Sequence, residues 1–229
     1  MLPADLRAAE AETLTAVQAA LDADGRGRWS VEWRFEGLRL LAPVLRLLQS
    51  LAALEVNALL LFSDAGGAAL ARRDAPELAE RILDFRQLQQ RQQQQGSDGV
   101  LLVVAPSAAE YEAFEALCGE HCGAVVMVNG RLEDAAVGIG SVARERRRGF
   151  VATWSSAYAL LPLDGGALRH ALPGEWQLYR QDRDGYRQIG SFAQRPDAET
   201  IATALSGDAA GGLGSTLRSV DALIEGLRA

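Results

Sequence analysis

The stretch VNALLLFSD, residues Val56 to Asp64, sets an unbroken apolar run between an asparagine and a serine–aspartate pair. A run of this length without polar alternation is typical of a β-strand that helices cover on both faces. Two further runs share the pattern, GVLLVVAPS at Gly99 to Ser107 and GAVVMVNG at Gly123 to Gly130. Helix-forming segments separate the three runs, and this alternation predicts a parallel sheet with right-handed crossovers.

The chain before these runs predicts a helix, a strand and a second helix. Residues 2–22 carry apolar side chains at helical spacing, which indicates an amphipathic helix. WSVEWRFEG, Trp29 to Gly37, alternates apolar and polar residues, so we expect a strand with one wet face, near an edge of the sheet. Leu38 to Leu54 is leucine-rich and reads as a helix.

The sequence pattern changes after Phe150. Short β-favouring runs follow one another between Asp-Gly and Pro-Gly turns, which predicts antiparallel strands over residues 150–192. RPDAETIATAL, from Arg195, then begins a helix. The expected fold is therefore a three-layer, Rossmann-like α/β domain over residues 1–205. Its mostly parallel sheet, with strands near 29–36, 58–63, 100–105 and 124–128, is extended by a C-terminal antiparallel meander.

Three segments carry weaker signals. Arg86 to Gly99 is rich in glutamine and poor in apolar residues, so we expect a mobile surface loop. Residues 206–215 read as a linker. Residues 216–228 read as an amphipathic helix that docks on the body of the protein or on a partner.

Composition excludes several functions. The net charge of −7 argues against general nucleic-acid binding, and no apolar run is long enough for a transmembrane segment. All 23 basic residues are arginine, so a phosphate-loop lysine and a Schiff-base lysine are absent. Cys118, His121 and Cys122 are too few for a metal centre and fit a reducing compartment. We predict no catalytic residue, no cofactor and no metal.

Polar residues follow the three buried strands where a parallel α/β sheet usually binds ligands. Asp64 follows the first strand, Ser107 the second, and Asn129 and Arg131 the third. Each also has a structural reading: Asp64 and Ser107 are good helix caps, Asn129 suits a turn, and Arg131 suits an internal ion pair with Asp64. The sequence leaves both readings open.

The segment SVARERRRGF, Ser141 to Phe150, adds a basic helix to this region. Arg144 and Arg148 share one face at i, i+4, which suits an anion, an acidic protein or a solvated surface. The preceding Gly138 and Gly140 lack the rest of a dinucleotide-binding fingerprint. We expect the ligand-binding residues to be Asp64, Ser107, Asn129, Arg131, Arg144 and Arg148.

Several stretches together resemble the domain-of-unknown-function family DUF1995 over most of Met1 to about Phe192. They are MLPADL at the start, FSDAGGAALARRD (Phe62 to Asp74), VAPSAAEYEA (Val104 to Ala113), VNGRLEDAAVGIGSVARERRRGF (Val128 to Phe150) and TWSSAYALLPLDGGALRHALPGEW (Thr153 to Trp176). Where the family pattern has Asn-Pro-Arg, this chain has Asn129, Gly130 and Arg131, and glycine gives a looser turn than proline.

The resemblance implies an oxygenic phototroph as the source, because the family belongs to cyanobacteria, algae and chloroplasts. Relatives include a chloroplast factor needed for photosystem II accumulation and a domain fused to a chloroplast adenylate kinase. It therefore implies a non-enzymatic accessory or assembly factor, cytoplasmic or on the stromal side of the thylakoid, whose partners are photosynthetic assembly or chlorophyll-pathway proteins. The alternative is an enzyme or sensor of a nucleotide or another phosphate-bearing small molecule; the oligomeric state stays open.

Overall fold

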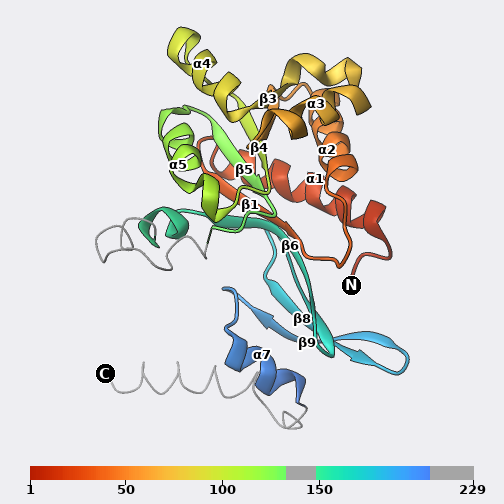
Figure 1. Ribbon diagram of the computed structural model, residues 1–229. Coiled ribbons are helices and arrows are strands. Elements are labelled where there is room, and N and C mark those ends of the chain that lie inside the picture. The colour runs from red at the N-terminus through yellow and green to blue at the C-terminus, as the bar shows by residue number, and fades with distance from the viewer. Residues whose placement is uncertain (133–147, 207–229) are drawn as a thin grey trace, which may run out of the picture.

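The computed structural model describes residues 1–132 and 148–206, which form one nine-stranded mixed sheet (Figure 1). The strand order is β3-β2-β4-β5-β1-β6-β7-β8-β9. The strands are β1 (Arg28–Trp33), β2 (Ala58–Phe62), β3 (Ile82–Asp84), β4 (Val100–Val104), β5 (Ala124–Val128), β6 (Ser155–Leu163), β7 (Gly166–Ala171), β8 (Trp176–Asp182) and β9 (Gly185–Phe192). The mostly parallel sheet with a C-terminal antiparallel meander is thus confirmed.

The strands from β3 to β6 in this order all run parallel, so their carboxyl ends gather at one edge of the sheet. We call this the carboxyl edge. The three apolar runs form β2, β4 and β5, which are direct neighbours. Every residue of β2 and β4 is buried, as expected for strands covered on both faces.

Strand β1 lies in the interior of the sheet, between β5 and β6. Our prediction that it lies near an edge is wrong. The alternation has another cause, because Trp29, Val31 and Trp33 enter the apolar core on one face of the sheet. Ser30 and Glu32, on the opposite face, line a pocket instead of open solvent.

One face of the sheet is covered by three helices (Figure 1). They are α1 (Leu6–Ala23), α2 (Leu41–Ala53) and α3 (Ala65–Asp74), with the 3-10 turn η1 (Pro76–Arg81) after α3. Trp33 is buried in the core beneath this layer, where its indole nitrogen donates a hydrogen bond of 3.0 Å to the hydroxyl of Thr13 on α1. This bond satisfies a polar group that the core would otherwise leave without a partner.

The opposite face is covered by α4 (Phe85–Gln95), the 3-10 turn η2 (Ala108–Glu110), α5 (Tyr111–Glu120) and the helical residues 148–152. Aromatic rings join these elements. Phe114 stacks on Phe85 and on Trp154, and Phe150 meets Phe114 edge to face. Such ring pairs add about 0.5–1.5 kcal/mol each beyond the burial of their area, so the segment at 148–154 is held firmly against α5.

The glutamine-rich segment forms most of helix α4, so our prediction of a loop there is wrong for residues 86–95. Asp84 and Gln87 form a capping box at its start, and Phe85, Leu88 and Gln92 bury one face. Glutamine is also a good helix former. Low mean hydropathy misled the prediction because a few well-spaced apolar residues suffice to dock a short helix.

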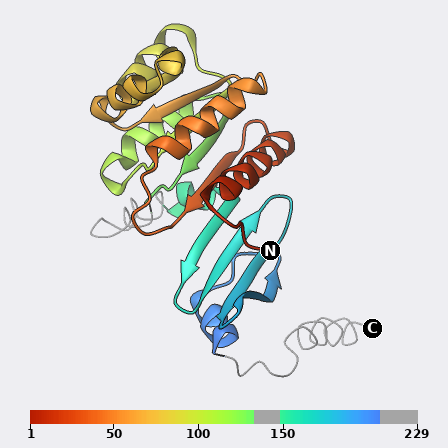
Figure 2. The same ribbon diagram turned by 90° about the vertical axis from the view of Figure 1, so that its right-hand side faces the viewer.

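The meander β6–β9 extends away from the helical layers, with α7 (Ala198–Leu205) packed on it (Figure 2). Strand β6 joins the two parts, since it runs parallel to β1 and antiparallel to β7. Glu12 on α1 also links them: its carboxylate accepts hydrogen bonds from Tyr158 and Arg169. The expected linker, from 207 on, and the expected last helix lie outside the described residues. In the described ranges, no helix is long and apolar enough to cross a membrane.

Candidate functional site

Four of the residues that the sequence singled out follow neighbouring strands at the carboxyl edge. Asp64 follows β2, Ser107 follows β4, and Asn129 with Arg131 follows β5, and these three strands are neighbours. The loops after β4 and β5 continue the ladder, because Ser107 pairs with Arg131 as an isolated bridge. The backbone N–H of Arg131 donates to the carbonyl of Pro106 at 2.8 Å. The two loops therefore form one connected surface.

Asp64 and Ser107 both act as helix caps. The Oδ1 atom of Asp64 accepts the N–H of Gly67 at 2.9 Å at the start of α3. Ser107 caps η2 in a capping box with Glu110, and its Oγ accepts the N–H of Ala109. Among the described residues, no ion pair joins Asp64 to Arg131, so the internal pair that we considered does not form. Each cap stabilises the fold by about 1 kcal/mol.

Asn129 holds β5 against β1 through its side-chain amide. Its Oδ1 accepts the N–H of Trp33 at 2.6 Å, and its Nδ2 donates to the carbonyl of Trp33 at 2.7 Å. Its own N–H donates to the carbonyl of Val31 at 2.8 Å. The side chain thus continues the hydrogen-bond ladder between β1 and β5 past the last residue of each strand. Beyond this point the chain after β1 and the chain after β5 lead to opposite faces of the sheet.

Two neighbouring strand ends adopt left-handed backbone conformations. Asn129 has a φ of 53°, and Ala105, the residue after β4, has a φ of 46°. Asparagine tolerates this region, whereas alanine does not, and the cost is of the order of 1 kcal/mol. The N–H of Ala105 donates to the carbonyl of Val128, which ties the two strained positions together. Strain of this kind concentrates at functional sites.

Two of the three candidate arginines lie on the described surface. Arg131 and Arg148 are exposed, the first beside Ser107 and the second at the start of the helical residues 148–152. Arg144, with the rest of residues 133–147, lies outside the described residues. Exposed guanidinium groups suit bidentate contacts with carboxylates or phosphates.

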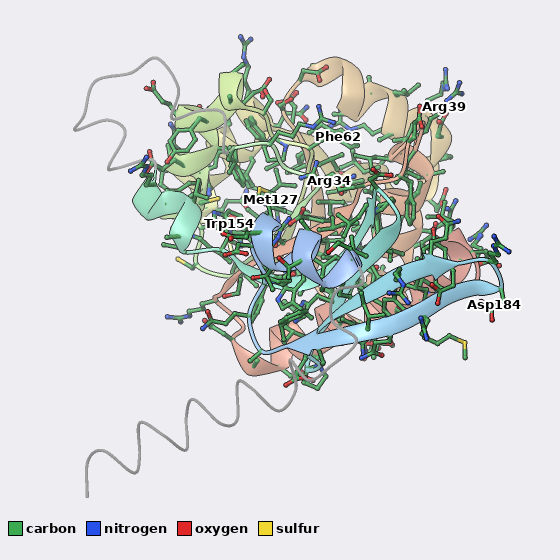
Figure 3. All side chains as sticks on the ribbon, turned by 90° about the horizontal axis from the view of Figure 1, so that it is seen from below. Arg34, Arg39, Phe62, Met127, Trp154 and Asp184 are labelled. Carbon is green, nitrogen blue, oxygen red and sulfur yellow. The ribbon has the colours of Figure 1, made fainter. Side chains whose placement is uncertain are left out.

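A pocket of about 210 Å³ opens beside Gly130, on the face covered by residues 148–154. Ser30 and Glu32 of β1 belong to its lining, together with the arginines Arg34 and Arg195. Met127, Leu132, Val151 and Trp154 supply the apolar part of the lining. Arg34, Met127 and Trp154 lie near one another in Figure 3, in the view from below. We call this space the β1 pocket.

The charges of the β1 pocket centre on Glu32. Its carboxylate accepts from Arg195 Nη1 at 3.1 Å and from Arg34 Nε at 3.4 Å, and its side chain is 15% exposed. Arg34 Nη2 also donates to the carbonyl of Gly130 at 2.9 Å, and the Arg195 guanidinium lies 5.4 Å from the centre of the Trp176 ring. One carboxylate thus faces two guanidinium groups, which leaves one net positive charge.

Gly130 permits the present shape of this pocket. A Cβ at this position would lie 2.2 Å from the sulfur of Met127, a residue of the pocket lining. The proline that the family resemblance leads us to expect would therefore displace the Met127 side chain. The glycine and the methionine fit each other.

Sequence reasoning missed Glu32, Arg34, Trp154 and Arg195. The alternation of polar and apolar residues in WSVEWRFEG was the signal that could have found Glu32. Since β1 is an interior strand, a charged residue on its second face lies inside the sheet layers and not in open solvent. Arg195 comes from the segment before α7 and is remote in sequence, so no local pattern relates it to β1.

The cysteine–histidine group near the end of α5 shows no catalytic arrangement. Burial raises the pKa of the Cys118 thiol to about 12, so this thiol is a poor nucleophile, while Cys122 is exposed. The His121 ring contacts the Ser97 hydroxyl at 2.7 Å and the Gly99 carbonyl at 3.1 Å, and burial lowers its pKa. These contacts fasten the turn between α4 and β4.

Comparison with known proteins places the chain by family. Among curated proteins, no match was found. The family model described as "Domain of unknown function (DUF1995)" matches residues 3–203, which include all nine strands and all the residues of the carboxyl edge and the β1 pocket. The chain therefore belongs to the DUF1995 family.

Proposed function

We propose that this protein is a non-enzymatic accessory or assembly factor of the photosynthetic apparatus in an oxygenic phototroph, working on the cytoplasmic or stromal side of the thylakoid. The photosynthetic assignment rests on the resemblance of the sequence stretches described above. The mode of action rests on the carboxyl edge, where we place the contact with acidic groups of a partner protein.

The observation that carries this proposal is the set of hydrogen bonds that the polar side chains of the carboxyl edge make. Asp64 and Ser107 cap helices and Asn129 joins two strands, so their hydrogen-bonding groups serve the fold. Arg131 at this edge is exposed, and so is Arg148 on the helical segment that covers one face of the sheet. An edge of this kind favours docking through guanidinium groups over a reaction that needs a positioned base or nucleophile.

Local charge supports recognition of an acidic partner. The whole chain carries a net charge of −7, so an arginine-bearing edge stands out against an acidic background. Such a contrast steers an acidic patch toward this edge and repels it elsewhere. Binding should therefore weaken as the salt concentration rises, because salt screens exposed charges.

The test is affinity capture from a thylakoid-containing lysate with the wild-type chain and two charge-matched double variants. Arg131→Ala alters the carboxyl edge, and Arg148→Ala, combined with it, alters the helical residues 148–152. Arg26→Ala with Arg183→Ala removes the same charge from exposed positions in two turns elsewhere. We expect wild type and the second variant to recover photosystem or chlorophyll-pathway proteins, and the first variant to lose most of them. Recovery of none by the wild type, or equal recovery by both variants, contradicts the proposal.

The strained backbone at Ala105 favours a second candidate, a nucleotide or phosphorylated metabolite bound by Arg131 at the same edge. Strained non-glycine residues often occur at ligand contacts. A thermal-shift screen of nucleotides and sugar phosphates should then raise the melting temperature of the wild type, and Arg131→Ala should abolish the rise. A flat screen counts against this candidate and leaves the docking proposal standing.

A further inference from the structure

The β1 pocket combines charged and apolar lining residues. Arg34, Arg195 and Glu32 lie among its polar lining residues. Its apolar lining comes from β5, from the residue just after the β5 turn, and from the segment at 148–154. A space lined in this way suits a molecule that has one polar head and an apolar body.

We propose that the β1 pocket binds a carboxylate that stands next to an apolar group, either on a small organic acid or at the end of a protein chain. The pocket uses residues different from the exposed Arg131 and Arg148. It therefore goes beyond the proposed function, and either one can fail while the other holds.

The hydrogen bonding of the two arginines supports an anion. Arg34 uses Nε and Nη2, and Arg195 uses Nη1, in bonds to Glu32 and Gly130. Within residues 1–132 and 148–206, no acceptor is bonded to Arg34 Nη1 or to Nε and Nη2 of Arg195. A guanidinium carries five N–H donors in a fixed fork that matches a carboxylate. The unused donors can bind a second carboxylate beside Glu32.

The balance of charge favours a monoanion. Two guanidinium groups against the Glu32 carboxylate leave one positive charge, which a single carboxylate neutralises. A phosphate dianion would leave an excess of negative charge next to Glu32, whose side chain is mostly shielded from solvent.

The volume limits the size of the ligand. The pocket volume of about 210 Å³ lies below the roughly 300–1,000 Å³ that is usual for sites of drug-sized ligands. One ring or one short alkyl chain with its carboxylate fits this space, and a whole nucleotide does not. Phenylacetate is a suitable probe, and phenylacetamide is its neutral isostere.

Binding is measured by isothermal titration calorimetry on the full chain with phenylacetate, phenylacetamide and inorganic phosphate. A tripeptide that ends in phenylalanine, with a free or an amidated carboxyl end, tests the protein-chain source. We expect the carboxylate form of at least one pair to bind ten or more times more tightly than its amide, and phosphate to bind more weakly than that carboxylate. Binding by phenylacetate alone identifies a small acid, and binding by the tripeptide alone identifies a chain end.

Three variants locate the binding. Arg195→Gln and Arg34→Gln should each lower the affinity for the carboxylate ligand at least fivefold. Arg183→Gln, on the β8–β9 turn, should leave this affinity unchanged. If Arg34→Gln disturbs the fold, the Arg195→Gln variant provides the test. The Arg195 side chain is 49% exposed, so the fold should tolerate its substitution. Equal affinities for acid and amide, stronger binding of phosphate, or wild-type affinity in Arg195→Gln overturns the proposal.

Discussion

Replacing Thr13 with valine should destabilise the protein by leaving the indole N–H of Trp33 without its acceptor, the Thr13 hydroxyl, which itself donates to the carbonyl of Ala9. Thr13 is fully buried and Trp33 is 1% exposed, so water cannot replace the lost acceptor. Valine has nearly the shape of threonine and a similar helix propensity, which confines the change to the hydroxyl. An unsatisfied buried donor costs about 1–3 kcal/mol, and we expect a loss of that size in the free energy of unfolding.

A double-mutant cycle isolates this bond from the effect of packing. Trp33→Phe removes the donor together with part of the ring, and its cost comes mainly from the cavity. In the double variant no donor is left without an acceptor. Thr13→Val with Trp33→Phe should therefore cost about 1 kcal/mol or more less than the sum of the two single changes.

The assay is urea unfolding followed by far-UV circular dichroism, because the loss of a tryptophan changes the fluorescence signal itself. Thr13→Ser serves as the control, since it keeps the hydroxyl and deletes only a methyl group. Its cycle with Trp33→Phe should show no coupling. If the Thr13→Val cycle is also additive within about 0.5 kcal/mol, the bond does not stabilise the core as we reason.

Two other predictions concern Asn129 and the buried histidines. Asn129→Ala should lower the free energy of unfolding by about 2–4 kcal/mol, because it loses two hydrogen bonds and places a Cβ-bearing residue without a side-chain partner at a φ of 53°. Asn129→Gly should cost about 1 kcal/mol less, since glycine accepts this φ; equal costs in urea unfolding would show that strain has no part. Burial lowers the pKa of His121 and of His170 below that of an unfolded histidine. The unfolded chain therefore takes up more protons than the folded chain as pH falls below about 6.5, and stability should fall between pH 7.5 and pH 5.5. Replacing both histidines with glutamine should flatten this dependence, and a slope unchanged in that variant would assign it to other groups.

Several features of the molecule could be predicted from local sequence. VNALLLFSD, GVLLVVAPS and GAVVMVNG are apolar without interruption, and only strands that are covered on both faces satisfy such runs. Asp64 and Ser107 precede helix-forming segments, and both cap helices. Turn residues between short β-favouring runs indicated the meander, because a hairpin depends on a few residues that are adjacent in sequence.

Other features depend on contacts between distant residues, and here the predictions were wrong or missing. Glu32 looked like the outer face of an edge strand, and its position became clear only when β5 and β6 were seen on either side of β1. The glutamine-rich helix α4 depends on Phe85 and Leu88 meeting the apolar face that β2 and α5 present. Strand β3 has three residues, too few to form a pattern.

The amino-acid order alone predicted buried parallel strands followed by polar residues, and it shows that the only cationic side chains besides histidine are arginines. The spacing of apolar residues within a segment indicates which of its faces are buried, because the side chains of that segment determine which faces avoid water. The β1 pocket was decided by tertiary structure alone. Glu32 and Arg195 are 163 positions apart and meet only because the segment after β9 returns to β1.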